Sequence, residues 1–188
     1  MPKPTLPKGW NQVSLEQFIE LRQLKGEDGV FNHNIDILCT LTDGLPDDFD
    51  DIDIADVGEI FKELPWLYTE PSKLYTDRIG KFYLKPMTDL TLGEFIDLEH
   101  YFTTDYLQYL PNICALLYRI PEIVEDNVVA KWESTDFKTS SRVHYFLDQP
   151  ITKMYGVLTE YIKFRDSFIT SHKNLMSEQV GEDVNDIT

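Results

Sequence analysis

The sequence has no long hydrophobic run, and it is poor in cysteine, glycine and basic residues. No apolar stretch approaches the roughly 20 residues that a helix needs to cross a bilayer. The first ten residues contain three prolines and no apolar segment of the kind that secretory signals carry. We therefore expect residues 1–9 to form an extended arm, and we expect a soluble protein made in the cytoplasm.

Cysteine and histidine are too few and too scattered to predict a disulfide framework or a zinc site. Cys39 and Cys114 are the only thiols, and each lies in an apolar segment with a helical pattern. Isolated thiols in such segments are more often small core side chains than a redox pair. The four histidines lie far apart along the chain, and none has the close Cys or His neighbour of a structural zinc site.

Motifs of catalysis are also missing. No serine lies in a Gly-x-Ser-x-Gly turn, and no glycine-rich phosphate loop is present. The segment 51–62 begins with the alternating aspartates of a calcium loop, but Ala55, Asp56 and Lys62 stand where that loop needs a ligand, a glycine and a glutamate. Pairs of carboxylates that could serve in acid–base catalysis are expected from composition alone, because 33 residues are acidic. We predict a protein that is not an enzyme and that needs no cofactor.

Negative charge is what the sequence has in excess. The formal net charge is −16, and half of it lies in residues 43–63, where nine acidic residues accompany the single Lys62. Such a field repels nucleic acid and anionic lipid and favours basic protein partners. We therefore expect no direct binding to nucleic acid or membrane. The residues predicted to contact a partner here are Asp47, Asp48, Asp50 and Asp51; a merely solvated acidic segment is the alternative.

Two segments 77 residues apart are nearly the same. Residues 13–22 (VSLEQFIELR) and residues 90–99 (LTLGEFIDLE) are identical at four of ten positions. Each contains the spacing of a capping box, in which the hydroxyl of Ser14 or Thr91 accepts a hydrogen bond from the third helical N–H. The match predicts one helical unit that is used twice. The apolar stripes predicted for the two helices are Leu15, Phe18 and Ile19, and Leu92, Phe95, Ile96 and Phe102.

These patterns predict a mainly α fold, with two related helical units joined by a short β-hairpin. Further helices are expected at about 33–42, 54–64, 107–119 and 151–176, and the stretch 122–149 is expected to be irregular. The hairpin is expected to have strands at 73–76 and 81–84 around a turn at 77–80. The predicted organisation is an arm (1–9), a first helical unit (10–72), the hairpin (73–88), a second helical unit (89–176) and a flexible acidic tail (177–188).

The predicted helix 151–176 has apolar side chains on more than one side. A surface that is wider than one stripe must be covered by the protein itself or by a partner. The residues that we predict to contact a partner or a second subunit are Tyr155, Ile162, Phe164 and Ile169. A buried position inside the same chain is the alternative.

Four motifs follow one another in a characteristic order: KGWNQVSLEQFIEL (8–21), LPDDF (45–49), GKFY (80–83) and DLTLGEFIDL (89–98). Over residues 9–119, this order resembles small acidic proteins encoded among the virion-morphogenesis genes of tailed bacteriophages. The likeness is to tail-assembly-chaperone-like and head–tail accessory proteins, including those of phages that infect Bacteroides-type hosts. Residues 150–170 fit the same pattern more loosely.

The resemblance implies a non-enzymatic protein of virion assembly or structure that binds other phage proteins or a second copy of itself. It implies a place in the host cytoplasm during assembly, and in the particle for a permanent component. Two alternatives stay open: a transient chaperone that binds the tape-measure protein, or an acidic DNA mimic that inhibits a host protein. The concentration of half the charge in 21 residues argues against the mimic. No catalytic, cofactor or metal residues come with the resemblance.

Overall fold

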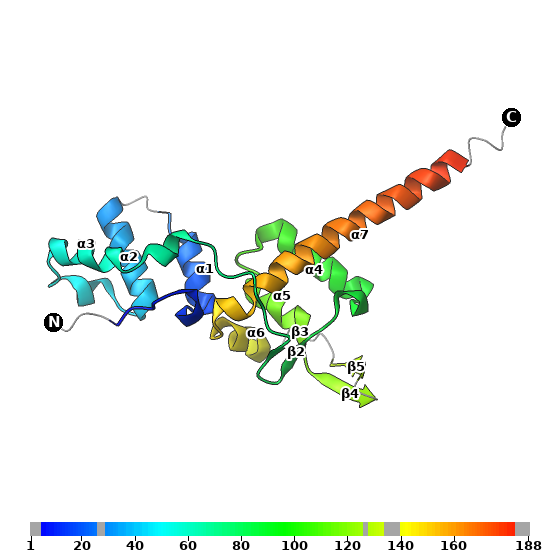
Figure 1. The fold of residues 1–188 in the computed structure, drawn as a ribbon, viewed down its shortest axis with the longest axis horizontal. Helices are drawn as coiled ribbons and strands as arrows, with labels where there is room; N and C mark the ends of the chain where they lie inside the picture. Colours follow the sequence, from blue (N-terminus) through cyan, green and yellow to red (C-terminus); the bar gives the residue numbers. More distant parts are fainter. Residues whose placement is uncertain (1–4, 26–28, 126–127, 134–139, 183–188) are drawn as a thin grey trace.

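The computed structural model of the chain describes residues 5–25, 29–125, 128–133 and 140–182 (Figure 1). The fold is mainly α-helical, as the sequence predicts, with seven α-helices and two small antiparallel sheets in the described part. No helix among these residues is long and apolar enough to cross a membrane.

The N-terminal part consists of three helices and the turns between them. The helices are α1 (Leu15–Gln23), α2 (Val30–Thr42) and α3 (Ile54–Lys62), and 3-10 turns follow α2 and α3 at Pro46–Phe49 and Pro65–Tyr68. The three predicted helices are thereby confirmed, although α2 begins three residues earlier than expected. In α1, Leu15 and Phe18 are buried, as the predicted stripe requires.

The central part contains a three-stranded sheet and two helices. Strands β1 (Arg78–Ile79) and β2 (Phe82–Leu84) form a hairpin, and β3 (Tyr118–Arg119) pairs with the other edge of β2. Between the second and third strands lie α4 (Leu92–Asp105) and α5 (Leu110–Leu117). The predicted helix 107–119 begins three residues later than expected, at Leu110, and ends two residues earlier, because Tyr118 and Arg119 leave the helix to join the sheet.

The predicted hairpin is correct in kind and wrong in register. The turn consists of Gly80 and Lys81, not residues 77–80, because Ile79 pairs with Phe82 and both side chains are buried. A buried apolar pair fixes strand register, since a slip of one strand by one residue would turn its apolar side chain to solvent. Gly80 has a φ of 59°, which glycine adopts without strain. Residues 73–76 form no strand.

The stretch 122–149 is not irregular, and that prediction is wrong. It contains most of a second hairpin, β4 (Pro121–Glu125) and β5 (Val128–Trp132), followed by α6 (Ser140–Leu147). The hairpin has register shifts between its strands, so the regular alternation that predicts a strand is broken. The short helix α6 was not predicted, because the residues that flank it in the sequence are strongly polar.

The last helix, α7 (Tyr155–Glu182), follows a 3-10 turn at Ile151–Lys153 and extends away from the body of the molecule (Figure 1). It begins later than predicted and continues six residues beyond the predicted end at 176. The first half of the predicted acidic tail is thus helical. Residues 183–188 lie outside the described residues, as do residues 1–4 of the predicted arm.

The apolar stripe predicted for α4 is wrong at Leu92 and Ile96, although Phe102 does pack against the core. Leu92 and Ile96 are 74% and 56% exposed, whereas Leu98 and the carboxylate residue Glu94 are buried. Phe95 is half-buried, and its ring lies 4.9 Å from that of Phe168 on α7. The capping box itself is present, with Thr91 accepting from the Glu94 N–H. The sequence therefore predicts where α4 begins but not which of its faces is buried.

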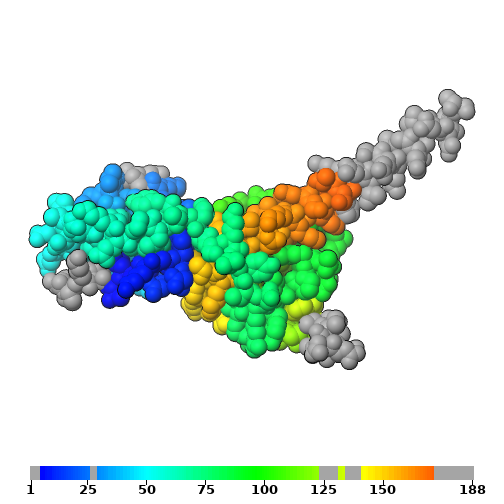
Figure 2. Space-filling view, in the orientation of Figure 1, coloured from blue at the N-terminus to red at the C-terminus, as the bar shows by residue number. Residues whose placement is uncertain are grey.

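One hydrophobic core joins the two predicted units. It includes Leu15 and Phe18 from α1, Leu38 from α2, and the apolar residues of α5 and of the start of α7. The segment around residue 150 lies between the N-terminal part and the rest of the molecule (Figure 2). Cys114 belongs to this core, as predicted, and burial raises the pKa of its thiol to about 12. Cys39 is half-buried against the core.

Backbone contacts hold the N-terminal part and the C-terminal part together. The Leu15 N–H donates to the Gln149 carbonyl at 2.9 Å, and the Ile151 N–H donates to the Val13 carbonyl at 3.0 Å. At the start of α7, Gly156 lies against the strap formed by residues 73–76, and a Cβ at this glycine would lie 2.0 Å from the Lys73 carbonyl oxygen. Such a distance leaves no room for a side chain at position 156.

Candidate protein-binding surfaces

The acidic segment forms one wall of a groove, which we call the acidic groove. It has a volume of about 480 Å³ and lies between α2, the Pro46–Phe49 turn and the start of α3. Its lining is mainly apolar and includes two carboxylates, Asp36 and Asp50. The lining residues are Phe31, Asn32, Ile35, Asp36, Pro46, Phe49, Asp50, Ile52 and Ile54.

Local capping interactions shape this groove. Asp43 ends α2 in a left-handed conformation with a φ of 53°, and Gln17 of α1 donates to its carboxylate at 3.2 Å. The Asp48 carboxylate then accepts a hydrogen bond from the Leu45 N–H at 2.8 Å, which closes the following 3-10 turn. The buried ring of Phe49 fixes the turn against the core. These contacts hold the chain in the bend that separates α2 from α3.

All four predicted acidic contact residues are exposed, but they have different roles. Asp50 lines the acidic groove, whereas Asp48 is engaged in the turn. Asp47 and Asp51 lie beside them in the chain and face solvent. The sequence prediction did not include the apolar members of the groove or Asp36. On α2 the four-residue spacing of Phe31 and Ile35 is visible in the sequence.

A second depression, which we call the central cleft, lies between the N-terminal part and α4, α5 and α7. It has a volume of about 440 Å³ and is mostly apolar. Two of the predicted α7 contact residues, Tyr155 and Ile162, line it. The other lining residues are Phe18, Arg22, Glu70, Lys73, Phe102, Tyr106, Leu107, Leu110, Leu158 and Thr159.

A polar cluster closes one side of the central cleft. The Tyr155 hydroxyl donates to Glu70, and Arg22 forms an ion pair with the same carboxylate at 3.2 Å. Burial, followed by the hydrogen bond to Glu70, raises the pKa of Tyr155 to about 12. The same hydrogen bond and the Arg22 charge hold the pKa of Glu70 below its ordinary value. The cluster links the N-terminal part to α7 and leaves the cleft floor apolar.

The third surface, which we call the α4–α7 face, is aromatic and aliphatic. It consists of Leu92, Phe95, Ile96, Phe164 and Phe168. The Phe168 ring lies 4.9 Å from Phe95 and 6.1 Å from Phe164, so the two helices share one apolar surface. Phe164 is one of the predicted contact residues. Ile169, another of them, is half-buried further along α7, so the four predicted residues on this helix do not converge on one site.

An ion pair joins α4 and α7 beside this face. The Glu99 carboxylate accepts from the Arg165 guanidinium at 2.6 Å and from the Tyr161 hydroxyl at 3.2 Å. Tyr161 is fully buried, and its ring stacks on that of Phe102 at 4.8 Å. The pKa of Tyr161 is raised by burial and by Glu99. These contacts join α4 to α7 beside the α4–α7 face.

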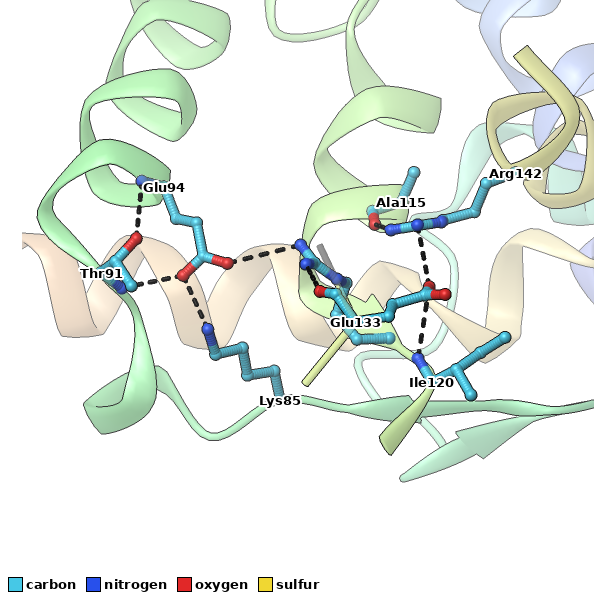
Figure 3. A network of polar contacts seen from close by, with 8 residues as sticks. Lys85, Thr91, Glu94, Ala115, Ile120, Glu133 and Arg142 are labelled. Atoms are coloured by element: carbon cyan, nitrogen blue, oxygen red, sulfur yellow. Dashed lines mark hydrogen bonds and ion pairs between the residues drawn. The ribbon is translucent and has the colours of Figure 1, made fainter. Parts of the chain in front are cut away.

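A buried ionic network lies on the other side of α4 (Figure 3). The Glu94 carboxylate binds Lys85 at 2.7 Å and Arg119 at 3.4 Å, and it also accepts from the Thr91 N–H at 2.8 Å. Burial by itself raises the pKa of Glu94, but the hydrogen bonds from Lys85 and Thr91 and the charges of Lys85 and Arg119 outweigh it, so the pKa is lowered overall.

The network continues from Arg119 toward α6. Arg119 donates to the Glu133 carbonyl, and the Glu133 carboxylate forms an ion pair with Arg142 at 2.8 Å. Arg142 also donates to the Ala115 carbonyl at 3.2 Å. The network therefore ties α4, β3, α5 and α6 together, which is a structural role. Sequence reasoning identified Glu94 only as part of a capping box, because its partners lie up to 25 residues away along the chain.

Within the described residues, no group of three or more histidine, cysteine, aspartate or glutamate side chains is positioned to hold a metal ion. Comparisons of the chain with protein-family models, with curated proteins and with solved structures found no match. The surfaces themselves are therefore the basis for a functional interpretation. All three surfaces carry apolar side chains. At the central cleft and beside the α4–α7 face, Arg22 pairs with Glu70 and Arg165 pairs with Glu99.

Proposed function

We propose that this chain is a non-enzymatic protein of tailed-bacteriophage assembly or structure that acts by binding other proteins. The observation that supports it most is the α4–α7 face, where Leu92, Ile96 and Phe168 are exposed beside two half-buried phenylalanines. Contiguous apolar patches of this kind mark interaction sites on soluble proteins. The ion pair between Glu99 and Arg165 holds this surface in place without a partner.

Two further features support the proposal. The order of motifs over residues 9–119 resembles small acidic phage assembly and head–tail accessory proteins. In addition, α7 has 28 residues and is therefore about 42 Å long, so it extends beyond the body that its first turns contact. A helix that leaves the body can reach neighbouring subunits in an assembly. The partners proposed are other phage assembly or structural proteins.

Co-purification tests this proposal directly. An affinity-tagged copy of the chain is produced in cells that make the corresponding phage, and the mass of the recovered complex is measured by light scattering. We expect a complex well above the 22.0 kDa of one chain, with phage structural or assembly proteins in stoichiometric amounts. Recovery of the chain alone as a monomer would contradict the proposal.

A matched pair of variants connects the result to the α4–α7 face. Leu92→Glu places a charge on the face, at the first position of α4, where a carboxylate is tolerated by the helix dipole. Leu74→Glu places the same charge on an equally exposed leucine outside the face. We expect the first variant to lose most of the recovered partners and the second to keep them. Equal recovery would assign the contacts to another surface.

Mass spectrometry of purified particles separates a permanent component from a transient chaperone. Stoichiometric copies in the particle would contradict the chaperone alternative, whereas their absence combined with recovery of the tape-measure protein would support it.

A pull-down from uninfected host lysate addresses the DNA-mimic alternative. Stoichiometric capture of a single host nucleic-acid-binding protein there would favour that alternative over the assembly role.

A further inference from the structure

We propose that the acidic groove is a docking site for a basic amphipathic helix of a partner protein. This proposal deepens the assembly role proposed above and rests on it. It assigns a partner chemistry to one surface: a helix with apolar residues along one side and lysine or arginine on both borders of that side. The argument uses the shape of the groove, its charge and the elements that border it.

The shape of the groove fits an apolar helix face. Phe49 is buried at its floor, and Ile35 and Ile52 are half-buried in its walls. Phe31 and Ile54 line it from α2 and α3, and Ile54 is 76% exposed. Covering large, exposed aliphatic and aromatic side chains with a partner is favourable, because it removes apolar surface from water. Helix-in-groove recognition uses this arrangement, with partner side chains spaced three or four residues apart.

The charge around the groove selects a basic partner. Residues 30–64 contain ten acidic residues and a single lysine, Lys62, which is already paired with Glu59 at 2.6 Å. In the part of the chain that the structure describes, no cation lies within ion-pair distance of Asp36 or Asp50, the two carboxylates in the lining. Unpaired carboxylates beside apolar area favour a partner that supplies both positive charge and apolar side chains.

The chain that joins α2 to α3 adds acidic side chains near the groove. Asp43 is the C-cap residue of α2. The Pro46–Phe49 turn, which contributes Pro46 and Phe49 to the lining, also carries Asp47 and Asp48.

A helix fits the groove better than a metal ion or a strand. Among the described residues, the groove carboxylates do not converge in a group that could hold a metal ion. The groove is also bordered by helices and a 3-10 turn, and the residues from 30 to 64 include no strand edge to which a partner strand could add. Charges that are separated along the groove match a ligand whose positive charges are also separated, as lysines along a helix are.

A peptide probe tests the proposal. The probe is an 18-residue amphipathic peptide of leucine and lysine with a helical period, and binding to the full chain is measured by fluorescence anisotropy. The matched controls are the same peptide with glutamate for lysine, and a peptide of equal composition with the helical period scrambled. We expect binding of the first peptide only, weakening as salt rises because exposed charge pairs are screened.

Two pairs of variants assign the binding to the groove. Asp36→Asn with Asp50→Asn removes the two lining charges, and Asp97→Asn with Asp148→Asn removes two exposed charges elsewhere. Ile54→Ser shortens a groove side chain, and Leu74→Ser does the same to a leucine that is 78% exposed outside it. We expect each groove variant to weaken binding at least about fivefold and each control to change it less than about twofold.

Amide chemical-shift mapping of the unmodified chain gives an independent measurement. We expect the peptide to shift resonances of α2, the Pro46–Phe49 turn and the start of α3. No binding at low salt, equal effects of groove and control variants, or shifts centred elsewhere would each overturn the proposal. The assembly role has its own test, since co-purification can succeed through the α4–α7 face even when the peptide does not bind.

Discussion

Helices α1 and α4 begin with nearly the same sequence and bury different faces. Both start at a hydroxyl N-cap with a complete capping box. Leu15 is fully buried in α1, whereas its counterpart Leu92 is exposed in α4. The third helical residue differs as well: Gln17 in α1 reaches Asp43 near the surface, whereas Glu94 in α4 points inward to Lys85 and Arg119. Similar local signals thus start both helices, and long-range partners decide how each one is rotated.

The largest expected difference between the two helices is at the third helical residue. Glu94→Ala leaves Lys85 and Arg119 buried without their carboxylate, which we expect to lower the free energy of unfolding by about 3–5 kcal/mol. Gln17→Ala removes only a cap and a surface hydrogen bond, so we expect about 1 kcal/mol or less. Urea unfolding followed by circular dichroism measures both. Similar values would show that the ionic network does not distinguish the helices.

The first helical residue gives the next largest contrast. Leu15→Ala creates a cavity in the core and is expected to lower the free energy of unfolding by about 2–5 kcal/mol. Leu92→Ala changes an exposed side chain and is expected to stay within about 0.5 kcal/mol. Thermal and urea unfolding of the two variants side by side would test the assigned rotation. A large loss for Leu92→Ala would mean that α4 buries the same face as α1.

Acid should lower the free energy of unfolding through Glu94 of α4. Its pKa is lowered in the folded protein, so the unfolded chain binds the proton more readily. The stabilisation is therefore present above the ordinary glutamate pKa and is lost as pH falls through the lower folded value. Urea unfolding from about pH 6 to about pH 3 should show this loss in the unmodified chain, and the Glu94→Gln variant should show a flatter profile. Parallel profiles would contradict the assignment.

The smallest expected difference lies at the N-caps. Ser14→Ala and Thr91→Ala each remove a hydroxyl that accepts from the third helical N–H, at 3.1 and 3.3 Å. We expect each to lower the free energy of unfolding by about 1 kcal/mol. The two values should agree to within about 0.5 kcal/mol, as measured by urea unfolding. A clear difference would indicate that the caps, and not only the buried faces, distinguish the helices.

The sequence predicts the features that depend on neighbouring residues. Helix starts at Ser14 and Thr91 and the mainly α class follow from local spacing and composition. The same is true of the exposure of Asp47, Asp48, Asp50 and Asp51. The pairing of β2 with β3 joins residues 34 and 36 positions apart, and the Glu94 network spans α4, β3 and α6, so no local pattern shows them. The internal duplication stays a prediction. The apolar half of the acidic groove was missed because Phe31 and Ile54 come from different helices.

The close approach at Gly156 has a consequence for how the molecule unfolds. The strap at residues 73–76 crosses the start of the last helix there, and the Thr76 N–H donates to the Lys153 carbonyl at 3.3 Å. Residues 73–76 therefore contact residues 153–156, and the nearby Ile151 N–H donates to the Val13 carbonyl. Because these contacts join the N-terminal part to the C-terminal part, we expect the two to unfold together, and calorimetry should record a single cooperative transition.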